Sequence, residues 1–218
     1  MTTIQNAESE VYQGQFGEFT ITESDRQGVI IYRAGLMAAA LSFALGTLLV
    51  LKFASYAFVP VALNVLYICF SIGLAVSLLM IHIYLAPLHR ALQAFWLAGT
   101  VAAIAIALTH SEPLALAVYH QPTTILGIGF IFAALTGIFF KEAFCFNRLE
   151  TKLLTPLVPL LLLGHLFGIL SVPLEQVLLG LWAALFVVFA LRKVVQPIPP
   201  DIGDKSVFVY LKQQAAVE

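Results

Sequence analysis

The chain has 218 residues, of which 61% are hydrophobic and 11% are charged, and its formal net charge is -1. Soluble domains are about 45–50% apolar and about 25% charged, so this composition excludes an ordinary soluble protein and indicates a membrane domain in a lipid bilayer. A nearly neutral chain has no overall attraction for nucleic acid, so we expect no nucleic-acid partner.

Six apolar stretches are long enough to cross a bilayer, which takes about 20 residues of helix. In chain order they cover about Ala34–Leu51, Val59–Leu85, Ala91–Thr109, Pro122–Phe140, Leu153–Ser171 and Pro173–Leu191. A shorter apolar stretch, Pro113–Tyr119, predicts a helix at the membrane surface. Because the long stretches are apolar on all sides and do not alternate, they predict transmembrane helices and not barrel strands. The expected fold class is an all-α, polytopic bundle of six spans.

Positive charge falls almost wholly on one side of this bundle. With six spans, every Lys and Arg of the 11 except Lys52 lies in the tails or in the connections on the same side as the tails. Positively charged loops stay in the cytoplasm, so we expect both termini on the cytoplasmic or stromal side. The expected organisation is a tail at 1–29, a membrane domain at 30–193 and a second tail at 194–218.

The two tails contain short apolar segments. Gln15–Thr22 alternates between apolar and polar residues, which favours a strand. Val207–Leu211 is a second strand candidate, and the two could pair on the same side of the membrane.

His165 is the main candidate for chemistry within the membrane, because ionisable groups in hydrocarbon are functional candidates by default. One interpretation is an imidazole that forms a hydrogen bond between helices, and another is an axial ligand of a chlorophyll or similar pigment. His82 differs from His165 by roughly 13 Å in depth, at 1.5 Å per residue, so the two cannot share a metal ion and make a poor pair for a bis-histidine haem. The sequence predicts no metal site and requires no cofactor, although a pigment stays open.

The segment Lys141–Glu150 is the least ordinary part of the sequence. Glu142 and Arg148 are expected to form an ion pair, and Phe144 lies at the membrane boundary. Together with the residues before the first span, this segment predicts a docking face on the inner side, although the end of an amphipathic helix is the alternative. The docking face comprises Arg26, Tyr32, Arg33, Lys141, Glu142, Phe144 and Arg148.

Two motifs resemble those of a known family: DRQGVIIYRAGL at Asp25–Leu36 and KEAFCFNRLE at Lys141–Glu150. The family consists of integral membrane proteins of cyanobacteria and photosynthetic eukaryotes, described only as a domain of unknown function, and the resemblance covers about residues 12–195. It implies a thylakoid or plasma membrane location. It supplies no catalytic residues.

No catalytic motif or pair of acids within the membrane is present, which favours a protein without enzymatic activity. We expect an accessory or assembly factor that works beside photosynthetic or other membrane complexes, whose subunits would be its partners. Two alternatives remain: a small-molecule transporter or channel lined by His165 and the proline-containing fifth span, or a protein that binds pigment or haem.

Overall fold

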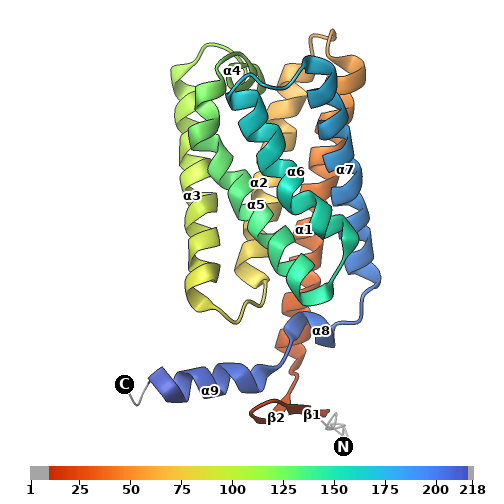
Figure 1. Ribbon diagram of the computed structural model, residues 1–218, viewed down its shortest axis with the longest axis vertical. Coiled ribbons are helices and arrows are strands. Elements are labelled where there is room, and N and C mark those ends of the chain that lie inside the picture. The colour runs from red at the N-terminus through yellow and green to blue at the C-terminus, as the bar shows by residue number, and fades with distance from the viewer. Residues whose placement is uncertain (1–9, 216–218) are drawn as a thin grey trace, which may run out of the picture.

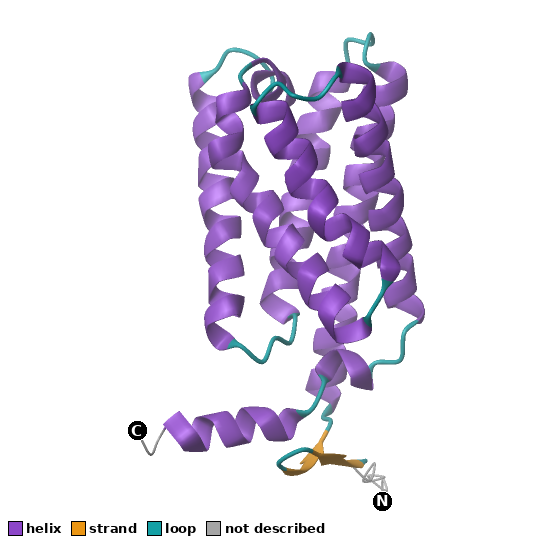
Figure 2. Cartoon of the chain, in the orientation of Figure 1, coloured by secondary structure: helices purple, strands orange, loops and turns teal. Residues whose placement is uncertain are grey.

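The computed structural model of the chain describes residues 10–215. Its long helices run side by side in one bundle, and helix dominates the whole molecule (Figures 1 and 2). Six helices of this part of the chain are long and apolar enough to cross a membrane. They are α1 (Glu23–Phe53), α2 (Val59–Met80), α3 (Ala86–Thr109), α5 (Ile125–Phe146), α6 (Leu149–Leu166) and α7 (Val172–Val195). The predicted all-α bundle of six spans is confirmed.

Helix α1 begins well before the first predicted span. Thr22 caps it: the Thr22 hydroxyl accepts from the backbone N–H of Asp25 at 3.2 Å, and the Asp25 carboxylate accepts from the N–H of Thr22 at 2.8 Å. Such a capping box satisfies two backbone donors that a helix start leaves free. The 31 residues of α1 reach about 46 Å, against a hydrocarbon core of about 30 Å, so α1 projects beyond the other spans (Figure 1).

The helices pack as two groups that meet where α6 contacts α7 and where α2 contacts α3. Helix α1 packs against α2 and α7, whereas α5 packs against α3 and α6, and α6 contacts α7. The contact of α1 with α2 depends on two glycines, because a Cβ on Gly35 would lie 2.6 Å from the Gly73 carbonyl oxygen. The aromatic core includes Phe139, Phe186 and Trp182, all of which are buried.

The two ends of the bundle differ. One end carries α4 (Leu114–His120) and the short 3-10 helix η1 (Pro122–Thr124). The bounds of α4 differ by one residue at each end from those of the surface helix predicted at Pro113–Tyr119. The other end, here called the tail end, carries both ends of the described chain (Figure 1). It comprises the hairpin of β1 (Val11–Gly14) and β2 (Gly17–Thr20), then α8 (Pro199–Ile202) and α9 (Lys205–Ala215). The strands are antiparallel, with Val11 opposite Thr20.

The C-terminal tail departs from the prediction. The expected strand at 207–211 is wrong, because these residues lie in α9, and β2 pairs with β1 instead. A short apolar run cannot be told from a buried helix by its pattern alone. In α9 the ring of Tyr210 stacks on Phe16 with centroids 4.0 Å apart, and Phe208 lies 5.0 Å from Tyr84. The two tails therefore do contact each other, but through side chains and not through a sheet.

Candidate functional site

A buried charge cluster lies where α1, α5, α7 and α8 meet at the tail end. Its members are Arg33 on α1, Lys141 and Glu142 in the last turns of α5, Lys193 near the end of α7, and Asp201 on α8. Glu142 and Lys193 are 0% exposed, Asp201 is 5% exposed and Arg33 is 9% exposed. Charged side chains are almost never buried to this degree unless they are paired, so the partners of each one matter.

Asp201 connects the C-terminal tail to two helices. One oxygen, Oδ2, accepts from Arg33 Nε at 2.9 Å and from Nη2 at 2.6 Å. The other, Oδ1, accepts from the Lys193 ammonium and from the Gln196 side-chain amide. The Arg33 guanidinium also donates to the carbonyl oxygens of Gln196, at 2.7 Å, and Pro197, at 2.9 Å. Arg33 therefore holds the whole segment between α7 and α8 against the bundle.

Glu142 lies between two ammonium groups. Its Oε2 accepts from Lys193 Nζ at 2.9 Å, and its Oε1 accepts from Lys141 Nζ at 2.9 Å and from the Tyr32 hydroxyl at 3.2 Å. The Tyr32 carbonyl in turn accepts from the Ser77 hydroxyl at 3.0 Å, which ties α2 to the same network. All four carboxylate oxygens of Glu142 and Asp201 accept hydrogen bonds, so neither carboxylate is free to act as a general base.

The ring of Phe146 is surrounded by cations. Lys193 Nζ lies 4.5 Å from its centroid, Lys141 Nζ 5.4 Å and the Arg148 guanidinium 5.7 Å. An aromatic face attracts cations at such distances. Arg33, Lys141 and Lys193 pair with the carboxylates of Glu142 and Asp201, so the cluster carries one more positive charge than negative charge.

The tails close over the cluster. Lys205 Nζ donates to Asp25 at 2.7 Å, and the backbone N–H of Gln15 donates to Asp204 at 2.6 Å. The Gln15 N–H is the main cause that lowers the pKa of Asp204 below its usual value. Ile21, Val29 and Ile202 form a small apolar core beneath these bonds. The hairpin, the start of α1, α8 and α9 are therefore one ordered unit.

A cavity of about 590 Å³ lies beside the cluster, between the α2–α3 connection, the last turns of α5 and α8. Its polar lining includes Lys141, Asp201, His82 and Tyr84, and its apolar lining includes Leu88 and Phe140. Burial lowers the pKa of His82 and raises the pKa of Tyr84, so both side chains are neutral near pH 7.

The predicted docking residues separate into two groups. Tyr32, Arg33 and Glu142 are buried, and only 11% of the Lys141 side chain is exposed. Phe144 is 83% exposed, a third of the Arg26 side chain is exposed, and Arg148 is half-buried. The expected ion pair of Glu142 with Arg148 is wrong: Glu142 pairs with two lysines, and Arg148 donates to the Gln196 side chain.

Sequence reasoning missed Lys193 and Asp201. Lys193 follows Arg192 at the end of an apolar run, where a lysine is expected to reach solvent, and Asp201 follows a proline-rich stretch. The one signal in the sequence is the spacing of Lys193 from Phe186, Phe189 and Ala190, which places all four residues on one face of a helix, and the structure buries that face.

His165 lies at the opposite end of the bundle from the cluster. Its Nδ1 is 2.7 Å from Glu175 Oε1, its Nε2 is 3.2 Å from the Tyr119 carbonyl, and its ring stacks on Tyr119. Both ring nitrogens are thus engaged within the protein, and a pigment could bind only by displacing one partner. No group of three or more His, Cys, Asp or Glu residues suited to a metal ion occurs among residues 10–215.

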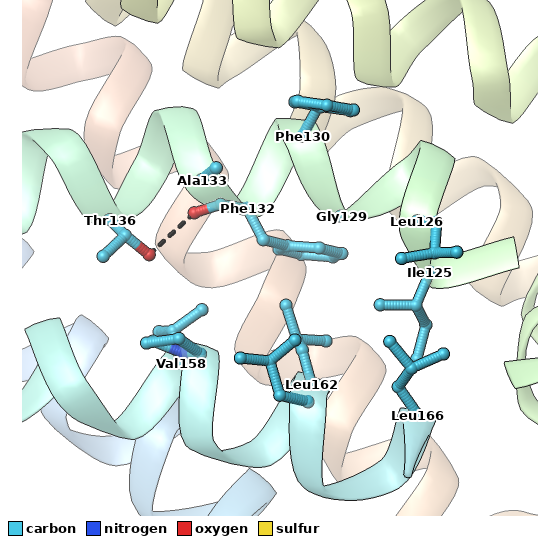
Figure 3. A pocket seen from close by; sticks show the side chains of 12 residues that line it. Ile125, Leu126, Gly129, Phe130, Phe132, Ala133, Thr136, Val158, Leu162 and Leu166 are labelled. Carbon is cyan, nitrogen blue, oxygen red and sulfur yellow. Dashed lines mark hydrogen bonds between the residues drawn. The ribbon is translucent and has the colours of Figure 1, made fainter. Parts of the chain in front are cut away.

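A second cavity, of about 360 Å³, lies between α5 and α6 and is lined by residues of both helices (Figure 3). Its walls are apolar, and the hydroxyl of Thr136 donates to the Phe132 carbonyl at 2.8 Å and not into the cavity. Leu162, Leu163 and Leu166 line it, whereas His165 does not. This cavity suits hydrocarbon and lacks the polar lining that a path for polar solutes requires.

Comparison with known proteins identifies a family. A family model described as uncharacterized integral membrane protein (DUF2301) matches residues 76–210, which is more than half of the chain. The match includes the motif at 141–150 and ends in α9, whereas the motif at 25–36 lies before it. No curated protein and no solved structure matches the chain. The resemblance to an integral membrane family of unknown function is thus confirmed, and the chain belongs to the DUF2301 family of integral membrane proteins.

Proposed function

We propose that this protein is a non-enzymatic accessory or assembly factor of membrane complexes, and that its tail end is the docking surface. The observation that carries the proposal is the buried charge cluster, which fixes the C-terminal tail to the bundle through Arg33, Lys193 and Asp201, while Asp204 and Lys205 bond that tail to the N-terminal one. A surface held in one shape loses little conformational entropy when a partner binds. The bias of Lys and Arg supports a cytoplasmic or stromal location for this end.

The surface available to a partner is narrower than the sequence predicts. Of the predicted residues, Arg26, Phe144 and Arg148 reach the surface, while the buried ones support them from within. Phe144 and Leu149 are 83% and 68% exposed at the membrane boundary, and the side chain of Arg192 is 54% exposed. Aromatic residues and arginines are the residue types most enriched in protein interfaces.

The chemistry of the cluster supports a non-enzymatic role. Both carboxylates are saturated with donors, and Lys193 is bonded to Glu142 and Asp201 at once. A catalytic acid or base needs an available lone pair or proton within reach of a substrate. The cluster is better suited to holding a structure than to moving protons.

A pull-down from native membranes tests this proposal. The full-length tagged protein is purified in mild detergent, and the eluate is analysed by mass spectrometry and absorption spectroscopy. We expect subunits of a membrane complex, photosynthetic if the membrane is a thylakoid, and we expect the double variant R26E/F144S to lose them. The matched control is Lys52→Gln at the opposite end of the bundle, which should retain them. A protein that is purified alone, with or without the substitutions, contradicts the proposal, and a coloured protein favours pigment binding instead.

A further inference from the structure

The cavity of about 590 Å³ at the tail end opens at the level where the spans end. Leu85 is 60% exposed, Phe140 is 55% exposed and Phe144 is 83% exposed, and all three line it. Leu85 directly precedes Ala86, the first residue of α3, and the two phenylalanines lie in the last two turns of α5. The mouth is therefore apolar and faces the boundary region of the bilayer, where a lipid would reach it from the side.

The inner end of the cavity is rich in hydrogen-bond donors. Lys141 Nζ carries three protons and makes one hydrogen bond among the described residues, to Glu142. The Tyr84 oxygen accepts from the backbone N–H of Asp204, so its own proton remains available to donate. His82 also lines the cavity, and a neutral imidazole carries one N–H donor. The carboxylate of Asp201, which also lines it, is saturated by Arg33, Lys193 and Gln196.

Positive charge exceeds negative charge around this end. Three cations, Arg33, Lys141 and Lys193, pair with the two carboxylates of Glu142 and Asp201, so the cluster beside the cavity carries one more positive charge than negative charge. Burying charge without a counter-charge is costly, so an anion that entered the cavity would be stabilised. Basic pockets between spans on the cytoplasmic side are a known setting for anionic lipid head groups.

We propose that this cavity binds an anionic membrane lipid. The phosphate of the head group lies at Lys141, where it accepts further hydrogen bonds from Tyr84 and His82. The acyl chains leave past Phe140 and Phe144 into the bilayer. The donors at the inner end and the apolar mouth together fit an amphiphile of this class, and Lys141 would repel a cationic head group. The cavity shares Phe144 with the proposed docking surface, but its occupant enters from the membrane, so the tests below measure lipid binding and not partner binding.

Cys145 provides a test without any change to the charge cluster. It lines the cavity and is exposed, and the other cysteine, Cys69, is replaced by serine so that one thiol remains. The full-length C69S protein in detergent is titrated with phosphatidylglycerol or phosphatidylcholine, and the rate of Cys145 alkylation by a maleimide is measured. We expect phosphatidylglycerol to slow alkylation in a saturable manner and phosphatidylcholine to leave the rate unchanged. Equal protection by the two lipids, or none, overturns the proposal, and protection by inorganic phosphate at equal concentration identifies a free anion as the ligand and overturns it as well.

Native mass spectrometry of bound phosphatidylglycerol tests the assignment of Lys141. The variant Lys141→Gln should bind this lipid about fivefold more weakly, the effect expected for one cation near a lipid head group. The matched control Lys152→Gln removes an exposed cation in the first turn of α6, outside the cavity, and should leave the affinity unchanged. An equal loss in both variants indicates unspecific charge attraction and contradicts the site.

Discussion

Replacement of Asp201 by asparagine is the most direct test of the charge cluster. The substitution keeps the shape of the side chain and removes the one charge that Arg33 and Lys193 share. Both cations are buried, with Lys193 at 0% exposure, so they cannot turn to solvent for compensation. Removing one partner of a buried ion pair costs about 3–5 kcal/mol because the other partner stays behind unpaired. For a chain of this length, that loss corresponds to a decrease in Tm on the order of 10 °C.

The free energy of unfolding is measured by titrating the protein from mild detergent into SDS, with tryptophan fluorescence as the signal. Trp182 suits this assay because it is 2% exposed in the core. The matched control is Glu112→Gln, which changes the exposed contact of Glu112 with His120 at the other end of the bundle and should cost less than about 1 kcal/mol.

A double-mutant cycle separates the charge effect from local damage. The variant Lys193→Met removes one of the two cations that Asp201 binds, and Lys193 keeps only Glu142 as a partner in Asp201→Asn, so the double variant should be more stable than the sum of the single effects predicts, by about 0.5–3 kcal/mol. Costs that add within about 0.5 kcal/mol, together with a loss below 1 kcal/mol for Asp201→Asn alone, would show that the cluster does not stabilise the tail end.

Three further predictions concern other parts of the molecule. Gly35→Ala should destabilise the protein by about 1–3 kcal/mol in the same titration, because its Cβ would lie 2.6 Å from the Gly73 carbonyl, whereas Gly180→Ala, with its nearest neighbour at 3.6 Å, should be neutral or stabilising. His165→Ala removes bonds to Glu175 and the Tyr119 carbonyl and should cost about 1–3 kcal/mol with no change in the absorption spectrum; a lost absorption band would identify a pigment ligand instead. Burial lowers the pKa of His82 below 6.5, so the unfolded state binds more protons than the folded state at acidic pH. The free energy of unfolding should therefore decrease as the pH drops below 6.5. His82→Gln should flatten this dependence, and an unchanged pH profile in the variant would contradict the prediction.

The architecture of the bundle could be predicted from sequence because it depends on local composition. A bilayer core of about 30 Å demands about 20 apolar residues for each span, and such stretches are visible without any tertiary contact. The boundaries were less accurate: α1 begins at Glu23 and not near Ala34, since Thr22 and Asp25 form a cap that outweighs the polar character of the first turns. In this longer helix, Tyr32 and Arg33 are buried in the bundle. Part of the docking face that the sequence predicted therefore lies in the buried charge cluster and not at the surface.

The sequence by itself determined that the protein lies in a membrane, that it crosses six times and that its cations gather at one end. The tertiary structure alone decided what those cations do. Arg33, Glu142, Lys193 and Asp201 come from four separate helices, with 168 residues between Arg33 and Asp201 along the chain, and no local pattern records their contact. The same holds for α9, whose apolar residues suit a strand or a helix equally until the hairpin and the α2–α3 connection lie beside them. Local composition determines that the helices lie in a bilayer, whereas the pairing of buried charges depends on packing between segments that are distant in the sequence.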